Sequence, residues 1–260
     1  MDVDDMQQLW LKNNHLGAPY LSLKRRVTIQ ACVAKMTIKS GAWGQNRQPP
    51  VQTRHQLQYR VSKGTPLLAN FTKASLIVPE TQAVARLLLE YPDAERWRQA
   101  IEVDNVLQAK TVNTAKSYAN IARMRLETMT EELWDVIANA ERPTAVQAIL
   151  ACALKFSPML AEFMRTSLAD EYRRMSPVLE DRVWRSFFAD MALNHRNLAE
   201  VSEGTQAKLR QNAYRILTEA GYLAKNKARS LQHVRVLPEI RGYLTNYGQQ
   251  DILSAMDCAH

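Results

Sequence analysis

The sequence predicts a mainly α-helical protein: a helical bundle with winged helix-turn-helix-like units and one small β-hairpin, the wing, near the C-terminus. Only 8 of the 260 residues are glycine, and hydrophobic residues make up 46% of the chain, enough to fill a core. From residue 67 onward, apolar side chains recur at steps of three and four. This is the period of a helix that buries one face.

Composition and pattern divide the chain into four regions. Residues 1–66 are expected to form a basic, poorly ordered extension, because Gly, Pro, Asn and Gln interrupt them and apolar residues show no sustained period. A short strand over 26–36 and a nucleic-acid-binding arm are alternatives for parts of this extension. Residues 67–175 are expected to form a helical N-terminal domain with a helix-turn-helix-like unit, residues 176–247 a winged-helix-like C-terminal domain, and residues 248–260 a tail.

Start signals mark the helices of the N-terminal domain. Pro79 suits the first turn of one helix, and Asp93 is placed to cap the next. A long helix is expected over 113–128, where apolar residues keep the helical period. Thr144 has capping-box spacing with Gln147 and is expected to open a strongly apolar helix.

The C-terminal domain is expected to contain three helices followed by a basic hairpin. Ser176 is placed to cap the first helix, residues 198–201 form a short second one, and Thr205 is placed to cap a longer third. Gly221 is suited to end that helix in a left-handed conformation. Residues 233–237 alternate like a strand and complete the hairpin.

The net charge of +8 is unevenly distributed along the chain. Residues 1–66 hold ten Lys/Arg against three Asp, and residues 205–247 hold eight basic against two acidic residues. A basic cluster confined to one structural unit indicates nucleic-acid binding more strongly than a high isoelectric point does.

Helix, short helix, longer helix and basic hairpin is the order of a winged helix-turn-helix, whose long helix enters the major groove of double-stranded DNA. The alternative interpretation is a solvated helix face and an ordinary basic loop. The candidate DNA-binding residues are Lys208, Gln211, Asn212 and Arg215 on the long helix, and Lys225, Lys227 and Arg229 in the hairpin.

A weak internal echo adds three candidates. Four residues of the long helix have identical residues 92 positions earlier, in the N-terminal domain: Ala207, Lys208, Asn212 and Arg215. The matching candidates are Lys116, Asn120 and Arg123. If the echo is structural, each chain carries two helix-turn-helix-like units.

Enzyme, metal and membrane functions find no support in the sequence. The five histidines lack metal-ligand spacing, and no phosphate-binding or nucleophile motif occurs, so we expect no catalytic residue, metal or cofactor. Cys32, Cys152 and Cys258 are too far apart and too few for a disulfide framework, which favours a reducing, cytoplasmic compartment. The longest apolar run, residues 145–154, is about half the length needed to span a bilayer.

Three segments resemble the BrxA family of bacterial phage-exclusion (BREX) defence systems. They are Asn70–Glu80, Leu150–Phe163 and Arg215–Leu223, and the resemblance covers about residues 70–247. The family pattern starts near Tyr59–Asn70, so residues 1–58 depart from it, and a natural start later in the chain is a further interpretation of the extension.

The resemblance implies a mostly helical, non-enzymatic accessory protein that binds DNA. It also implies partners in the same system: a methyltransferase, an ATPase and a phosphatase-like protein. The family is similar in helical architecture to the NusB type of RNA-binding antitermination factor, which keeps RNA as an alternative ligand. A protein-interaction scaffold with a basic face is the other alternative. No catalytic residues are implied.

Removing residues 1–58 is expected to leave the fold intact, because this segment has no apolar period with which to pack on the core. Thermal unfolding of the full and shortened chains tests this. A large fall in the midpoint after truncation would show that the extension packs on the core.

Overall fold

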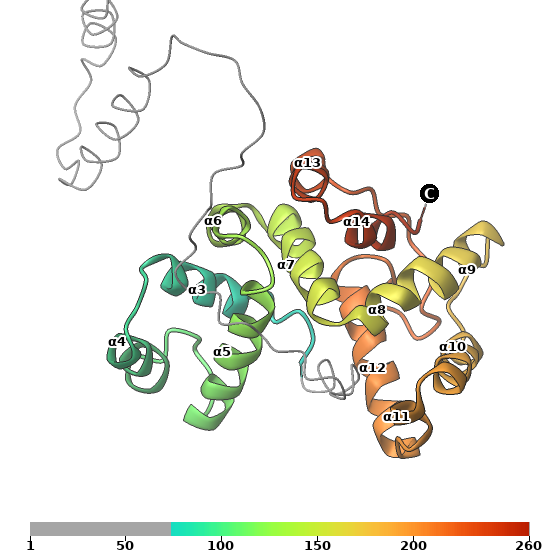
Figure 1. Cartoon of the computed structure of the whole chain (residues 1–260), viewed down its shortest axis with the longest axis horizontal. Coiled ribbons are helices and arrows are strands. Elements are labelled where there is room, and N and C mark those ends of the chain that lie inside the picture. The colour runs from blue at the N-terminus through green and yellow to red at the C-terminus, as the bar shows by residue number, and fades with distance from the viewer. Residues whose placement is uncertain (1–73, 260) are drawn as a thin grey trace, which may run out of the picture. The chain divides into compact units, whose positions relative to one another are not determined.

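A helix that is buried over most of its length lies at the centre of the described structure. The computed structural model describes residues 74–259, without the side chains of residues 194, 196 and 197. Within it, residues 145–154 of α7 (Arg142–Phe156) are buried all round. A helix that is apolar on every face belongs in the middle of a core. Accordingly, α7 contacts helices from both earlier and later parts of the chain (Figure 1).

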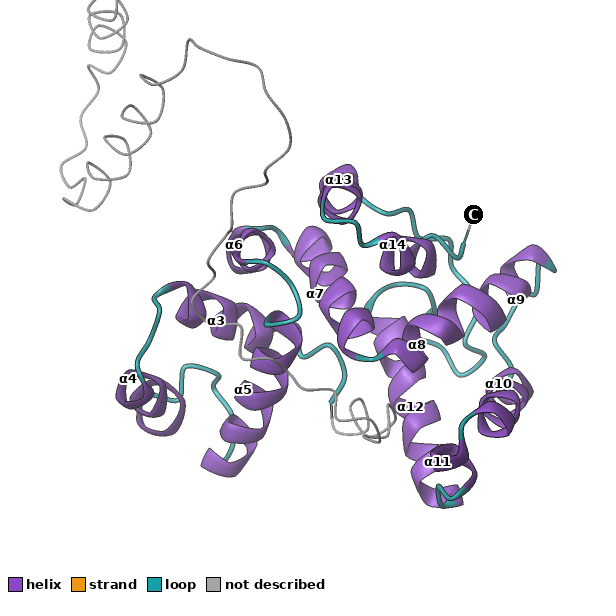
Figure 2. Ribbon diagram, in the orientation of Figure 1, coloured by secondary structure: helices purple, strands orange, loops and turns teal. Residues whose placement is uncertain are grey.

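Helices and loops make up all of the described residues (Figure 2). Two five-residue π-helical segments, η2 and η3, interrupt them. The elements are α3 (Val78–Leu89), α4 (Ala94–Arg98), η2 (Gln99–Val103), α5 (Val112–Leu126), α6 (Glu131–Asn139), α7 (Arg142–Phe156), α8 (Pro158–Phe163), η3 (Met164–Leu168), α9 (Ala169–Arg173), α10 (Asp181–Asn194), α11 (Arg196–Ala199), α12 (Glu203–Glu219), α13 (Pro238–Asn246) and α14 (Gln250–Met256).

The helices pack on α7 in two groups. On one side, α3 packs against α5 and α6, and all three contact α7. On the other, α8, α13 and α14 contact α7, while η3 links α8 to α10 and α14. All of the described residues, 74–259, belong to one compact unit. The division expected at residue 176 stays a prediction. The segment expected to be a tail contains α14, which buries four side chains.

A buried arginine holds the residues that precede α3. Arg125, on α5, is fully buried, and its guanidinium donates to the carbonyl oxygens of Ser75 (2.5 Å) and Ala74 (3.0 Å). Burial lowers the pKa of Arg125 to about 10, so its side chain remains charged at neutral pH. The next backbone amide, that of Leu76, donates to Glu219 Oε2 at 2.8 Å. Glu219 is at the end of α12, so residues 74–76 join α5 to α12.

Several expected start and stop signals are confirmed. Pro79 lies in the first turn of α3, and Asp93 caps α4 by accepting from the amide of Arg96 at 2.7 Å. Gly221 ends α12 with φ 89°. The amide of Tyr222 then donates to the carbonyl of Leu217 at 2.9 Å, which completes a Schellman-type cap.

Cys152 and Cys258 are buried thiols, and burial raises the pKa of each to about 12. Cys32 lies outside the described residues.

Three helix starts differ from expectation. Helix α7 begins at Arg142 rather than at Thr144, because Pro143 already fixes the backbone of its first turn. Helix α10 begins at Asp181 rather than after Ser176, since the residues between them run extended. Helix α12 is capped by Ser202, whose hydroxyl accepts from the amide of Thr205, the residue expected to be the cap.

The strand expected over residues 233–237 does not form. The carbonyl of Arg235 and the amide of Leu237 instead bond to the side-chain amide of Gln147 on α7, at 3.0 and 2.8 Å. One glutamine side chain thus satisfies the backbone groups that a neighbouring strand would have paired. The extension over 1–66 and the strand expected over 26–36 lie outside the described residues.

No single helix of the described residues is long and apolar enough to cross a membrane. The apolar α7 meets the length only together with the following helix, Pro158–Arg173, and the two are bent by 109°.

Arg125→Ala is expected to lower the free energy of unfolding by about 3 kcal/mol or more. Two buried carbonyls lose hydrogen bonds to a charged group, each worth roughly 1.5–3 kcal/mol, and a cavity remains. Arg142→Ala, which removes an exposed arginine from α7, is the control and should change the value by about 0.5 kcal/mol at most. Urea unfolding measures both variants. Equal stability of the two would contradict the role given to Arg125.

Candidate nucleic-acid interface

The polar face of α12 carries four of the expected DNA-binding residues. Lys208, Gln211 and Arg215 are exposed, and Asn212 is half-buried. Steps of three and four place them on adjoining positions of one helix surface. Arg215 Nε donates to Glu219 Oε1 at 3.2 Å, so its charge is partly neutralised by the glutamate that holds Leu76.

A tight turn after α12 presents the two expected lysines of the hairpin. Lys225 and Lys227 are both exposed. Asn226 closes the turn: its carbonyl accepts from the amide of Arg229 and its side chain accepts from the amide of Ser230, both at 3.2 Å. Arg229 has φ 55°, a left-handed conformation that is unfavourable for a side chain with a Cβ and is maintained by its surroundings.

The expected β-hairpin is reduced to single bridges. Leu223 pairs with Leu231 at the base of the turn, and Ser230 pairs with Val178 in the extended residues before α10. No strand forms in the described part of the chain. The backbone of Arg235, beyond this turn, bonds to Gln147 and not to a second strand. The pairing therefore does not extend beyond the residues at the base of the turn.

Arg229 braces the turn against two helices. Its Nη1 lies 2.7 Å from Asp181 Oδ1, at the start of α10, and its guanidinium stacks 4.7 Å above the ring of Tyr214 on α12. Burial raises the pKa of Tyr214, so the ring stays neutral under Arg229. Arg210 Nε also approaches Asp181, at 3.7 Å. The sequence predicts that Arg229 contacts DNA, and its two internal partners also make it part of the frame that holds Lys225 and Lys227.

Asp181 and Tyr214 were missed by sequence reasoning. Asp181 follows an expected helix cap by only a few residues, and Tyr214 lies beside the apolar stripe of α12. Neither signal distinguishes a bracing residue from a surface or core residue. Only the packing of α10 on α12, where the rings of Trp184 and Tyr214 meet at 6.4 Å, brings them together.

Residues 93–128, called the first unit below, carry the three candidates from the sequence echo, and two of these are paired with carboxylates. Lys116 Nζ lies 2.9 Å from Glu102, and Arg123 Nε lies 2.7 Å from Glu127. The guanidinium of Arg123 also lies 4.9 Å from the centre of the Trp97 ring. Asn120 is exposed.

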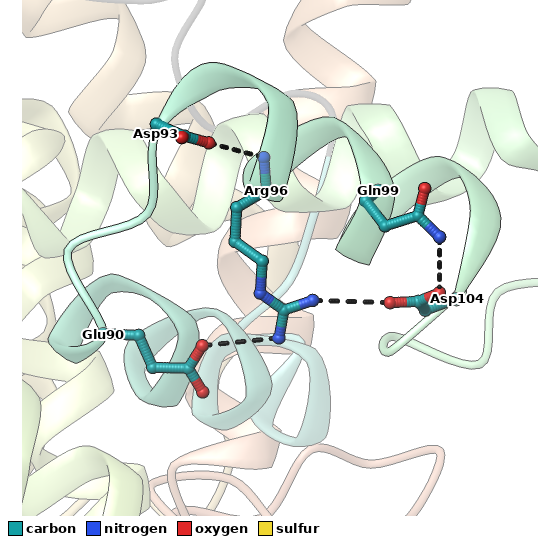
Figure 3. A network of polar contacts seen from close by, with 5 residues as sticks. All are labelled: Glu90, Asp93, Arg96, Gln99 and Asp104. Carbon is teal, nitrogen blue, oxygen red and sulfur yellow. Dashed lines mark hydrogen bonds and ion pairs between the residues drawn. The ribbon is translucent and has the colours of Figure 1, made fainter.

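Nearby charges in the first unit are also internally satisfied. Figure 3 shows Arg96 between Glu90 and Asp104, each 3.4 Å away, and Gln99 donating to Asp104 at 2.9 Å. Residues 93–128 hold six basic and five acidic residues. This unit therefore offers little net positive charge to a phosphate backbone.

The two helices related by the sequence echo bury different faces. Ala115 of α5 is buried, whereas Ala207, its counterpart 92 positions later in α12, is exposed. The eight residues 104–111 separate η2 from α5, which exceeds the turn of a helix-turn-helix; only residues 200–202 separate α11 from α12. The echo is thus one of sequence letters and not of packing.

The charge balance singles out α12 and its turn. Residues 74–259 hold 23 basic and 23 acidic residues, so the net charge of the whole chain comes from residues 1–73. Within this neutral part, residues 203–231 hold six basic and two acidic residues. Lys208, Lys225 and Lys227 form no ion pair with the described carboxylates. Among the described residues, no group of three or more His, Cys, Asp or Glu side chains could hold a metal ion.

Comparison with known proteins identifies the family. The sequence model of the BrxA family matches residues 68–248. Two proteins named "BREX protein BrxA" are similar over most of their length. The one from Paramagnetospirillum magneticum (strain ATCC 700264 / AMB-1) is 36% identical over 186 residues, 71% of this chain and 93% of the relative. The one from Escherichia coli O9:H4 (strain HS) is 34% identical over 182 residues, 70% of this chain and 85% of the relative.

The chain belongs to the BrxA family. A solved structure has a similar fold: the crystal structure of an uncharacterized protein from Magnetospirillum magneticum has a TM-score of 0.67 and 32% identity, and the match covers 73% of this chain and 97% of that one. The resemblance noted in the sequence is therefore confirmed. The BrxA match includes both α12 and its turn, while residues 1–67 precede it.

Arg229→Ala is expected to lower the free energy of unfolding by about 1–2 kcal/mol, because it removes a partly exposed ion pair and a cation–π contact. Lys227→Ala is the control and should stay within about 0.5 kcal/mol of the parent. Arg229→Gly removes the same side chain but relieves the left-handed backbone, so it should be less damaging than Arg229→Ala by roughly 1 kcal/mol. Urea unfolding in which Arg229→Ala and Lys227→Ala behave alike would rule out the brace.

Proposed function

We propose that this BrxA-family chain is a non-enzymatic component of a bacterial phage-defence (BREX) system that binds double-stranded DNA through α12 and the turn at 225–228. The observation that carries the proposal is the group of three exposed lysines, Lys208, Lys225 and Lys227, which have no carboxylate partner within residues 74–259. They lie in the part of an otherwise neutral structure where basic residues outnumber acidic ones.

The dimensions of α12 suit a major groove. Its 17 residues give a length of roughly 25 Å at 1.5 Å per residue, and a helix of ordinary width enters the groove of B-form DNA. In this proposal α11 and α12 act as a helix-turn-helix, and the turn at 225–228 acts as a short wing. Single bridges rather than a ladder hold this wing: Leu223 pairs with Leu231 at its base, and Ser230 pairs with Val178 in the residues before α10.

Contacts to phosphates are expected to dominate over contacts to bases. Lysine is a point charge that binds phosphate without reading sequence. Among the amide side chains on α12, Gln211 is exposed and can reach a base edge. Binding with weak sequence preference follows, and it suits an accessory protein in the cytoplasm that works beside the methyltransferase, ATPase and phosphatase-like protein of such a system.

Lys225→Ala combined with Lys227→Ala is expected to weaken binding to duplex DNA of any sequence. The log–log salt slope should flatten by about two units, since each phosphate contact contributes about 0.9. The parent slope should be about −4 to −5. Fluorescence anisotropy of a labelled duplex over a salt series measures both quantities. Lys110→Ala with Lys155→Ala is the matched control, because it removes two exposed lysines elsewhere.

Residues 1–73 carry the net charge and can add binding of their own, so variants of the same chain are compared. Absence of binding by the folded parent at low salt would overturn the proposal and favour a protein-interaction scaffold. Equal binding by both double variants would remove the site from this turn. Stronger competition by structured RNA than by duplex DNA would favour an RNA ligand.

A further inference from the structure

Two arginines approach one carboxylate, and a third lies one helical turn away from it on the same helix. Arg229, in the turn, and Arg210, on α12, approach Asp181 Oδ1 at 2.7 and 3.7 Å. Arg185 lies four residues after Asp181, one turn along the same face of α10. The contact between Trp184 and Tyr214 packs this part of α10 on α12, at the level of Arg210 and Arg229.

One carboxylate cannot neutralise three guanidinium groups. Glu180, which precedes Asp181 in the sequence, is already paired with Arg182 at 2.7 Å. Arg185 is exposed and forms no ion pair with a carboxylate of the described segment. The group Asp181, Arg185, Arg210 and Arg229 therefore holds two positive charges in excess.

The surroundings favour binding of an oxyanion over simple solvation. The side chains of Arg210 and Arg229 are each 31% exposed, so they are partly withdrawn from water, where screening is weaker. The pair of Arg229 with Asp181 and its stacking on Tyr214 fix one guanidinium in place before any ligand arrives. Guanidinium groups offer several donors in a planar fork that matches phosphate oxygens.

We propose that Arg185, Arg210 and Arg229 form a phosphate-binding site, and that its ligand is a phosphodiester of the DNA backbone. This inference rests on the proposed function, because the site adjoins the turn that carries Lys225 and Lys227. Arg185 and Arg210 supply donors to the phosphate, and Asp181 acts as a positioning residue that holds Arg229. The site extends the interface from α12 and the turn onto α10.

The test uses the full chain with Arg185→Gln combined with Arg210→Gln. Glutamine keeps much of the side-chain length and removes the charge. The matched control is Arg142→Gln combined with Lys155→Gln, which removes two exposed charges from α7. Duplex DNA binding is measured by anisotropy over a salt series, and inorganic phosphate is tested separately by its effect on the thermal unfolding midpoint.

The Arg185/Arg210 variant is expected to bind DNA at least about tenfold more weakly than the control, since hydrogen bonds to charged groups contribute roughly 1.5–3 kcal/mol each. Its salt slope should be flatter by about two units. DNA binding by the parent that is equal in both variants would overturn the site while leaving the proposed function intact. No DNA binding by the parent, with a midpoint raised by phosphate in the control but not in the variant, would support a site for free phosphate and overturn both the DNA ligand and the proposed function.

Discussion

The fold depends on a buried guanidinium whose hydrogen-bond partners are backbone carbonyls. Arg125 sits inside the core and is held by two backbone carbonyls of the segment entering α3. A buried charge is unfavourable unless its hydrogen bonds are made. If this segment left, the charge of Arg125 would lose these hydrogen bonds while remaining in the apolar core. Because the amide of Leu76 bonds to Glu219 at the same point, the constraint reaches α12 as well as α5. Three residues of backbone thus connect α5 to α12.

Contacts to Glu219 and Asp181 distinguish the basic side chains that hold the structure together from those that are available to a ligand. Glu219 also accepts from Arg215, and Asp181 accepts from Arg229, so both arginines serve the packing of α12 and its turn. Lys208, Lys225 and Lys227 form no ion pair with a carboxylate of the described residues. A surface ion pair contributes only about 0–1 kcal/mol to stability. Arg215 can therefore leave Glu219 and bind a phosphate instead, but Glu219, which also positions Leu76, then loses one of its partners. The lysines can therefore bind a phosphate without losing a packing contact, whereas Arg215 and Arg229 also hold α12 and its turn in place.

Sequence reasoning predicted what depends on local pattern. The apolar period identified α5 and the buried α7, and Gly221 marked the end of α12 because only a left-handed residue fits there. It failed where partners are distant in sequence. Residues 233–237 alternate like a strand, yet their backbone partner is the side chain of Gln147, which no local pattern reveals. Within the candidate interface, the basic residues were found as a group, but the pairing of Arg229 with Asp181 depends on how α10 packs on α12. The echo between α5 and α12 misled for the same reason, since matching letters do not fix which face a helix buries.

The central claim is that the DNA-binding surface lies on α12 and its turn and not on the charge-balanced first unit. Hydrogen–deuterium exchange of the full chain, with and without duplex DNA at low salt, tests this most directly. The account predicts slower exchange in residues 203–231 on adding DNA, with little change in residues 93–128. Protection confined to residues 93–128, with α12 and the turn unaffected, would contradict it and assign the basic turn to another partner.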